Sequence, residues 1–153
     1  MRAPLRRCRG DSGQVGGIEV LPFGFLIFVA GTLLLANVWG VIDAKLATTS
    51  AAREGARAFV EGDDVYAAAA EAEFRAQESL AAYGRNDERA TISAPTLPQG
   101  FTRCGRVTIT VTYDVPALFV PFIGGFGDLA PVRSTYTELI DPFRDGLPGP
   151  ALC

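Results

Sequence analysis

The chain has no histidine, and its 153 residues include a single lysine and three cysteines. Histidine is the commonest general base in enzymes and the commonest ligand of transition metals. The sequence also has no C-x-x-C pair, so the usual spacing of a zinc site is missing. These absences argue against catalysis, and we expect a non-enzymatic protein without a metal or a cofactor.

The 23 residues from Val20 to Ile42 contain no charged side chain. A helix of this length, at about 1.5 Å per residue, spans the roughly 30 Å apolar core of a bilayer. A single acid, Glu19, stands at its start, where a carboxylate is costly to keep. A cleaved signal peptide would have a shorter apolar core, so we expect an anchor that stays in place.

Basic residues precede this stretch, and acidic residues outnumber basic ones in the rest of the chain. Four arginines accompany Asp11, the only acid of the leader: Arg2, Arg6, Arg7 and Arg9. The positive-inside rule then places the N-terminus in the cytoplasm and the C-terminal domain outside the membrane. From Glu19 onward the chain has ten basic and sixteen acidic residues. Such an acidic exterior is a poor electrostatic partner for nucleic acid or for anionic lipid. The lipid bilayer is an expected partner of the apolar stretch alone.

Alanine-rich sequence continues the helix beyond the apolar stretch. Ala44–Val60 contains no proline, and Gly62 is the first clear break. Asp63 or Asp64 can cap a second helix, because a carboxylate there accepts from free N–H groups of the first turn. Gly84 is placed to end that helix in the left-handed conformation.

After Gly84 the hydrophobic period changes from that of a helix to that of a strand. Val107–Val115 alternates apolar and polar residues throughout, with threonines on the exposed side. Ala90–Ala94 and Val132–Ile140 are further strand candidates. The apolar run Leu118–Phe126 could be a partner-binding patch, but we expect it to fold back over the small sheet as core.

These patterns predict an α+β protein. A long N-terminal membrane helix extends into a second helix, and a small antiparallel sheet of about three strands follows. The expected parts are a basic cytoplasmic leader (1–12), a processing-like motif with the transmembrane helix (13–43), an extracytoplasmic helical stalk (44–84) and a small β-rich domain with an irregular tail (85–153). About 100 residues outside the membrane are enough for one small domain.

The cysteines fall on both sides of the expected membrane. Cys8 would lie in the cytoplasm, whereas Cys104 and Cys153 would share the oxidising exterior, where a disulfide is permitted. The sequence leaves open whether these two are bonded or stay as free thiols.

The residues before the apolar stretch, Gly13–Glu19, read GQVGGIE. One interpretation is a processing and assembly signal of the type IV pilin kind, in which a membrane peptidase cuts before the helix. A cut after Gly13 would make Glu19 the sixth residue of the mature chain, and a cut after Gln14 would make it the fifth. The alternative is an acid that marks the cytoplasmic edge of an ordinary anchor.

A second motif follows the membrane helix by about two turns: Ala51, Ala52, Arg53, Glu54, Gly55, Ala56 and Arg57. Its small residues recur four apart, so the backbone of another helix could approach closely. Its two arginines also lie four apart and could pair with acids on a neighbour. The alternative is a good helix-forming stretch with arginines that extend to the membrane surface.

The Gly-Gln and Glu19 before a proline-containing apolar helix, the Ala51–Arg57 motif and a threonine-rich strand together resemble the TadE-like family. This family comprises minor pilins or pseudopilins of tight-adherence, Flp-type pilus systems. The resemblance is specific over residues 13–59 and general beyond them. It implies an envelope protein that helps to build or prime a thin adhesive pilus, with a secretion ATPase, an inner-membrane platform and a prepilin peptidase as partners.

The sequence therefore predicts a structural or assembly subunit of such a pilus, held in the cell membrane by one helix. Glu19 and the apolar helix would pack with other pilin-like subunits, and Ala51–Arg57 would extend that interface. The alternative is a single-pass anchored binding module, in which the outer domain carries the function and the helix is only a tether.

Overall fold

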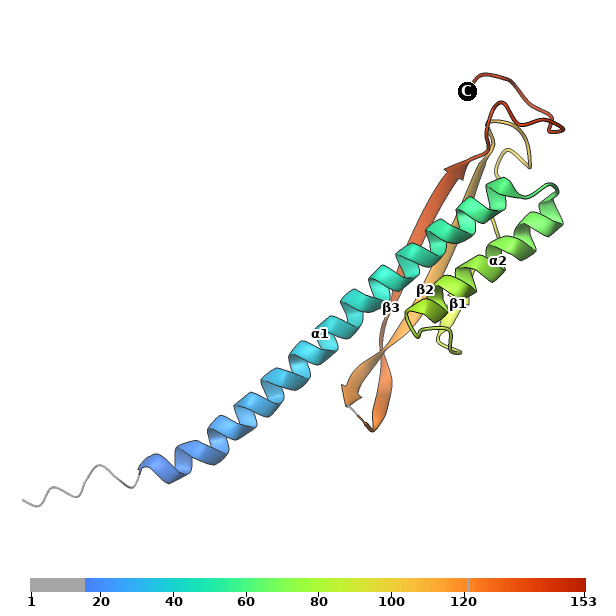
Figure 1. The fold of residues 1–153 in the computed structure, drawn as a ribbon. Coiled ribbons are helices and arrows are strands. Elements are labelled where there is room, and N and C mark those ends of the chain that lie inside the picture. The colour runs from blue at the N-terminus through green and yellow to red at the C-terminus, as the bar shows by residue number, and fades with distance from the viewer. Residues whose placement is uncertain (1–15, 121) are drawn as a thin grey trace, which may run out of the picture. The chain divides into compact units, whose positions relative to one another are not determined.

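A computed structural model describes residues 16–120 and 122–153. The elements follow in the order α1 (Gly16–Glu61), α2 (Val65–Ala82), β1 (Ala90–Ile92), β2 (Arg106–Val120) and β3 (Gly124–Leu139) (Figure 1). The chain divides into two compact units, one ending at Ala36 and one spanning Asn37–Cys153, which we call the domain. The predicted α+β class, with a long first helix, a second helix and a small antiparallel sheet, is confirmed.

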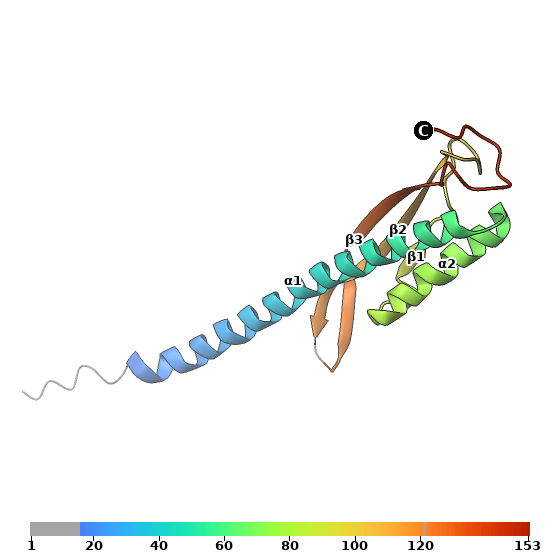
Figure 2. The same cartoon turned by 45° about the horizontal axis from the view of Figure 1, so that its top comes forward.

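Within the domain, α1 and α2 lie side by side and run in opposite directions (Figures 1 and 2). Gly62 forms the break between them, because a Cβ there would lie 2.7 Å from the Cα of Ala68. Asp64 caps α2, since its Oδ1 accepts from the backbone N–H groups of Tyr66 and Ala67 at 2.9 and 3.0 Å. The predicted break and the predicted N-cap are both confirmed.

The second helix ends in the predicted glycine cap. Gly84 has a φ of 66°, in the left-handed region that glycine adopts without a steric penalty. The N–H of Arg85 donates to the carbonyl of Leu80 at 2.9 Å, and that of Gly84 donates to the carbonyl of Ala81 at 2.8 Å. These two bonds satisfy carbonyls at the helix end and turn the chain toward the sheet.

The sheet has the order β1-β2-β3, and each neighbouring pair is antiparallel. The register of β2 on β3 shifts between Asp114 and Pro116. On the exposed face, threonine hydroxyls pair across the strands at 2.9 and 3.0 Å: Thr108 with Thr137, and Thr110 with Thr135. This is the threonine face that the alternation in the sequence predicts.

The other face of the sheet packs against the two helices. β2 contributes the alternating residues expected to be buried: Val107, Ile109, Val111, Tyr113 and Val115. The helices contribute mainly alanines, with Phe59 and Leu80 as their largest fully buried side chains. Because alanines keep the helix surface small, the backbones of α1 and α2 approach each other closely.

The run Leu118–Phe126 differs from its prediction. It does not fold back as core but forms the end of the β2–β3 hairpin, where Leu118 pairs with Phe126. Both side chains are exposed, at 43% and 52%. Strand pairing satisfies the backbone of this run without a fold back onto the sheet, and Pro116 is tolerated because it stands at the register shift.

The chain after β3 is irregular and returns to the start of β2. Cys104 and Cys153 form a disulfide, with their Cα atoms 5.5 Å apart. The N–H of Arg103 donates to the carbonyl of Pro148 at 2.8 Å. The tail is thus bound to the domain by a covalent bond and by a backbone hydrogen bond.

Candidate assembly interface

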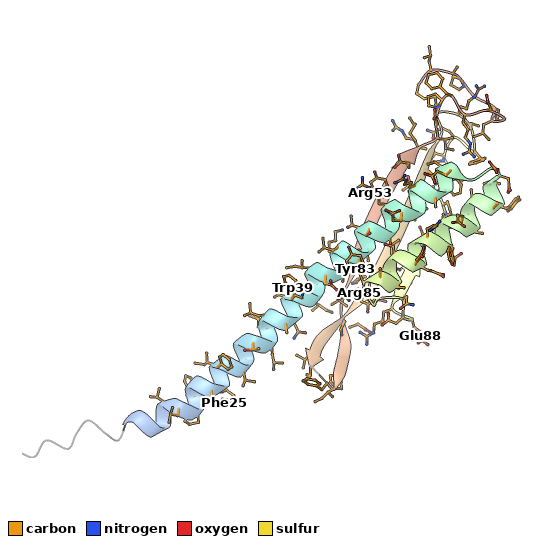
Figure 3. All side chains as sticks on the ribbon, in the orientation of Figure 1. Phe25, Trp39, Arg53, Tyr83, Arg85 and Glu88 are labelled. Carbon is orange, nitrogen blue, oxygen red and sulfur yellow. A yellow bond between two sulfur atoms is a disulfide. The ribbon has the colours of Figure 1, made fainter. Side chains whose placement is uncertain are left out.

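The first part of α1 is apolar on all sides. In the described part of the chain, one helix is long and apolar enough to cross a membrane, with a mean hydropathy of 2.2 in its most apolar window. None of that window is buried, and Phe25 and Trp39 are among the side chains that project from α1 (Figure 3). An apolar helix without protein cover is compatible with a single-pass membrane protein.

The leader motif is described only in part. Gly13 and Gln14 lie outside the described residues, whereas Glu19 lies in the first turn of α1, which begins at Gly16. A cut after either Gly13 or Gln14 would therefore leave a mature chain that becomes helical within its first three residues.

The Ala51–Arg57 motif lies on α1 within the domain, and its small residues face inward. All four are buried: Ala51, Ala52, Gly55 and Ala56. A Cβ on Gly55 would lie 3.0 Å from the carbonyl oxygen of Ala72 and 3.3 Å from the Cβ of Ala76. The helix that approaches this surface is thus α2 of the same chain. The expectation that these four residues extend an interface between subunits is corrected, because they are already covered.

The charged residues of the motif face outward. Arg57 pairs with Glu61 of its own helix at 3.2 Å, and both side chains are exposed. The guanidinium of Arg53 lies 5.9 Å from the ring centroid of Tyr136 on β3. Glu54 is exposed. A neighbouring subunit could reach these charges, although an acid that pairs with Arg57 would compete with Glu61.

The single lysine of the chain joins α1 to β3. Nζ of Lys45 donates to the carbonyl of Arg133 at 2.6 Å and to Oγ of Ser134 at 3.0 Å. The hydroxyls of Thr48 and Thr49 lie 2.8 and 3.0 Å from the same Oγ. Thr48 and Ser134 are almost fully buried, so their hydroxyls need hydrogen-bond partners within the protein. These hydrogen bonds form only when α1 packs on β3 in this register.

Arg85, directly after the α2 cap, joins α1 to α2 and to the sheet. Its Nε and Nη2 both lie 2.8 Å from Oδ2 of Asp43, and Nη2 donates to the carbonyl of Gly40 at 3.0 Å. The guanidinium carbon lies 4.8 Å from the ring centroid of Tyr113 on β2. The Arg85 side chain is 15% exposed, so this pair is screened less than an ordinary surface ion pair.

Tyr113 completes this cluster. Its hydroxyl donates to Oδ2 of Asp87 at 3.2 Å. Burial raises the pKa of Tyr113 above its ordinary value of 10.0, and the charge of Asp87 raises it further, whereas Arg85 lowers it. Because the larger effects disfavour the phenolate, Tyr113 remains a hydrogen-bond donor at neutral pH.

At the other end of the helix, Arg144 from the tail caps α1. Its guanidinium donates to the carbonyls of Val60 and Gly62, and at 3.3 Å to that of Glu61. The same group lies 5.7 Å from the ring centroid of Phe101. A cation at a helix C-terminus satisfies free carbonyls and complements the helix dipole.

Lys45, Arg85 and Arg144 are absent from the site residues that the sequence predicts. Lys45 meets Ser134 across 89 positions, and Arg144 meets Val60 across 84. No local pattern encodes such separations. The one signal in the sequence is that Lys45 is a single lysine among many arginines.

A cleft of about 410 Å³ lies between α2 and the start of the sheet. Its lining is mostly polar: Glu73, Gln77, Leu80, Asn86, Asp87, Ala90, Thr91 and Ile92. Among the residues that the structure describes, no group of three His, Cys, Asp or Glu side chains is placed to hold a metal ion.

No protein-family model matches the chain, and no curated protein or solved structure is significantly similar to it. Function is therefore inferred from the apolar helix, from the motifs around it and from the contacts of the domain.

Proposed function

We propose that this chain is a non-enzymatic structural or assembly subunit of a tight-adherence pilus, anchored in the cell membrane. Its N-terminus would be cytoplasmic and its domain outside the membrane. The observation that carries the proposal is the continuity of α1, Gly16–Glu61. One helix supplies both the exposed apolar segment and a central helix of the domain. Subunits could then pack through their apolar segments while their domains remain on the exterior.

The contacts of α1 support a subunit that transmits tension within an assembly. Lys45 connects the helix to β3, Arg85 connects it to α2 and β2, and Arg144 connects its end to the tail. A force on the apolar segment in an assembly would be transmitted to the domain through these three sets of contacts.

Glu19 supplies the part of the proposal that is specific to pili. In a bundle of apolar helices, an unpaired charge is very costly because the dielectric constant is low. The carboxylate of Glu19 would neutralise the terminal amine of a neighbouring pilin-like subunit. A prepilin peptidase would create that amine by cutting after Gly13 or Gln14, and the inner-membrane platform and secretion ATPase would drive assembly.

The second candidate is a membrane-anchored binding module. Burial of Ala51, Ala52, Gly55 and Ala56 inside the domain favours it, because this burial removes part of the surface expected to serve assembly. The polar cleft between α2 and β1 would then be the natural place for a ligand.

Replacement of Glu19 separates the two candidates. We expect Glu19→Ala to abolish surface pili in the organism that encodes the chain, with a normal amount of the protein in the membrane fraction. Glu88→Ala is the matched control, because it removes an exposed acid of the domain (Figure 3). Electron microscopy measures piliation, and intact-mass analysis of the extracted protein identifies its first residue.

Normal piliation in the Glu19→Ala strain would exclude the proposed role of the acid and favour the binding module. A mature protein that begins at Gln14 or Val15 would support the pilin-like route. A protein that begins after Ile42 would contradict both candidates, because neither could then be anchored.

A further inference from the structure

The end of the β2–β3 hairpin carries exposed apolar side chains, and we call residues 118–120 and 122–129 the hairpin tip. Five large apolar side chains are between 43% exposed and fully exposed: Leu118, Phe122, Ile123, Phe126 and Leu129. Between Val115 and Val132 the sequence has one charged residue, Asp128. A group of exposed apolar side chains with so little charge is typical of a contact with a partner or a membrane.

The domain gives the hairpin tip little support. β1 pairs with β2 only as far as Tyr113, and the buried residues of β2 end at Val115. Beyond this point the hairpin is a two-stranded ribbon, which alone is marginally stable in water. Phe122 also has a φ of 69°, which bulky residues rarely adopt. The hairpin tip thus costs stability without adding to the core.

The strands point the hairpin tip toward the end of the domain at which α1 leaves it. Val115 and Val132 pack with Ala44 of α1, on the Asn37 side of the main core. The hairpin continues from there in the same direction, and its tip is the part of the domain farthest from the C-terminus (Figures 1 and 2).

The same end of the domain carries Trp39, which is 69% exposed. Trp39 lies in the uncharged stretch Val20–Ile42, close to its C-terminal end. Tryptophan and tyrosine concentrate at the boundary between lipid and water, because each has an apolar ring and one polar group. Trp39 is thus suited to that boundary, and the exposed apolar ring of Phe122 is suited to the lipid beside it.

We propose that the hairpin tip inserts into the outer boundary of the bilayer, so that the chain contacts lipid through α1 and through the β2–β3 hairpin. The inference rests on the proposed membrane anchoring of α1. Lipid is the occupant that the position favours, because the apolar stretch of α1 requires a bilayer at this end of the domain. The bilayer would also bury the side chains that the two-stranded ribbon leaves in water.

Tryptophan fluorescence can test this insertion in the full-length chain. The native tryptophan is first removed by Trp39→Phe, and Phe122→Trp then places a single fluorophore at the hairpin tip. The protein is reconstituted in phosphatidylcholine vesicles with or without spin labels on the acyl chains. We expect a blue-shifted emission that the spin-labelled lipid quenches. Phe143→Trp in the same background is the matched control, because Phe143 is 76% exposed and lies in the tail; it should not be quenched.

A third protein separates failure of this inference from failure of the anchor. Phe28→Trp in the Trp39→Phe background reports directly on the apolar part of α1. Quenching of Phe28→Trp without quenching of Phe122→Trp would overturn the insertion of the hairpin tip and leave the anchor intact. No quenching of either would overturn both. A blue shift of Phe122→Trp without lipid quenching would assign the hairpin tip to a second copy of the chain and refute the lipid contact.

Discussion

Tyr113 and Arg85 meet where α1, α2 and β2 come together. The phenol donates to Asp87, and the guanidinium stacks on the same ring and pairs with Asp43. Each side chain thereby holds two or more elements. Their contributions to stability can be measured separately, because one depends on a titrating proton and the other on the geometry of the guanidinium.

Alkaline pH should weaken the domain through Tyr113. The pKa of Tyr113 is raised above its ordinary value of 10.0, so the folded state holds this proton more tightly than the unfolded state. The resulting stability is fully present below pH 10.0 and is lost as the pH rises through the folded-state pKa. We expect the melting temperature in detergent to fall more steeply above this pH for the native chain than for Tyr113→Phe. Equal slopes would show that Tyr113 is not responsible.

The planar guanidinium group of Arg85 should contribute to stability through its geometry as well as through its charge. Arg85→Lys keeps the charge but cannot bond Asp43, bond the Gly40 carbonyl and stack on Tyr113 together. We expect the free energy of unfolding to fall by about 1.5–3 kcal/mol, the scale of hydrogen bonds to a charged group. Arg106→Lys, at an exposed position, is the control and should change little. A similar loss in both proteins would show that the geometry at Arg85 is unimportant.

At the scale of elements, the packing of α1 on α2 depends on Gly55. A Cβ at Gly55 would already lie 3.0 Å from the carbonyl oxygen of Ala72, so Gly55→Leu must push the helices apart. We expect a loss of about 1–3 kcal/mol in the free energy of unfolding, as is usual for an overpacked core. Gly31→Leu, on the same helix with nothing within 4 Å of the added Cβ, is the matched control. Circular dichroism during thermal unfolding measures both, and equal melting temperatures would contradict the close packing.

The helices could be predicted from the sequence because their signals are local. Asp64 and Gly84 form hydrogen bonds with backbone groups only a few residues away. The residues that end α2 therefore lie next to it in the sequence and can be recognised there. The ends of β2 and β3 could not be predicted in the same way. Their pairing as far as Leu118 and Phe126 is a contact between two strands, and the period of one strand does not encode it.

At the scale of the whole molecule, the Ala51–Arg57 motif illustrates what the sequence leaves undecided. Small residues four apart predict that another helix approaches closely, and a helix does so. The sequence does not say whether that helix belongs to a neighbouring subunit or to the same chain. The distance from Gly55 to Ala72 identifies it as α2. The contacts of Lys45, Arg85 and Arg144 are harder still to predict, because each joins residues that only the folded chain brings together.

The Cys104–Cys153 disulfide should stabilise the domain as a whole, because it closes a segment of 49 residues that includes β2 and β3. We expect Cys104→Ser with Cys153→Ser to lower the free energy of unfolding by about 2–4 kcal/mol, mainly by releasing the unfolded chain. Thermal unfolding in detergent without reductant measures the loss. Cys8→Ser, which leaves the pair intact, is the control, and a reductant should reproduce the effect of the double change in the native chain.

The same disulfide also has a consequence for biosynthesis. Cys104 is synthesised 49 residues before its partner, which at about 5–20 residues per second is an interval of a few seconds. β2 and β3 are both synthesised within that interval, so the hairpin can form before Cys104 has a cysteine partner. With the proposed topology, an oxidase on the exterior side of the membrane would meet Cys104 first and hold it as a mixed disulfide until Cys153 has crossed. Closure of the bond would then report that the domain has been exported as far as its tail.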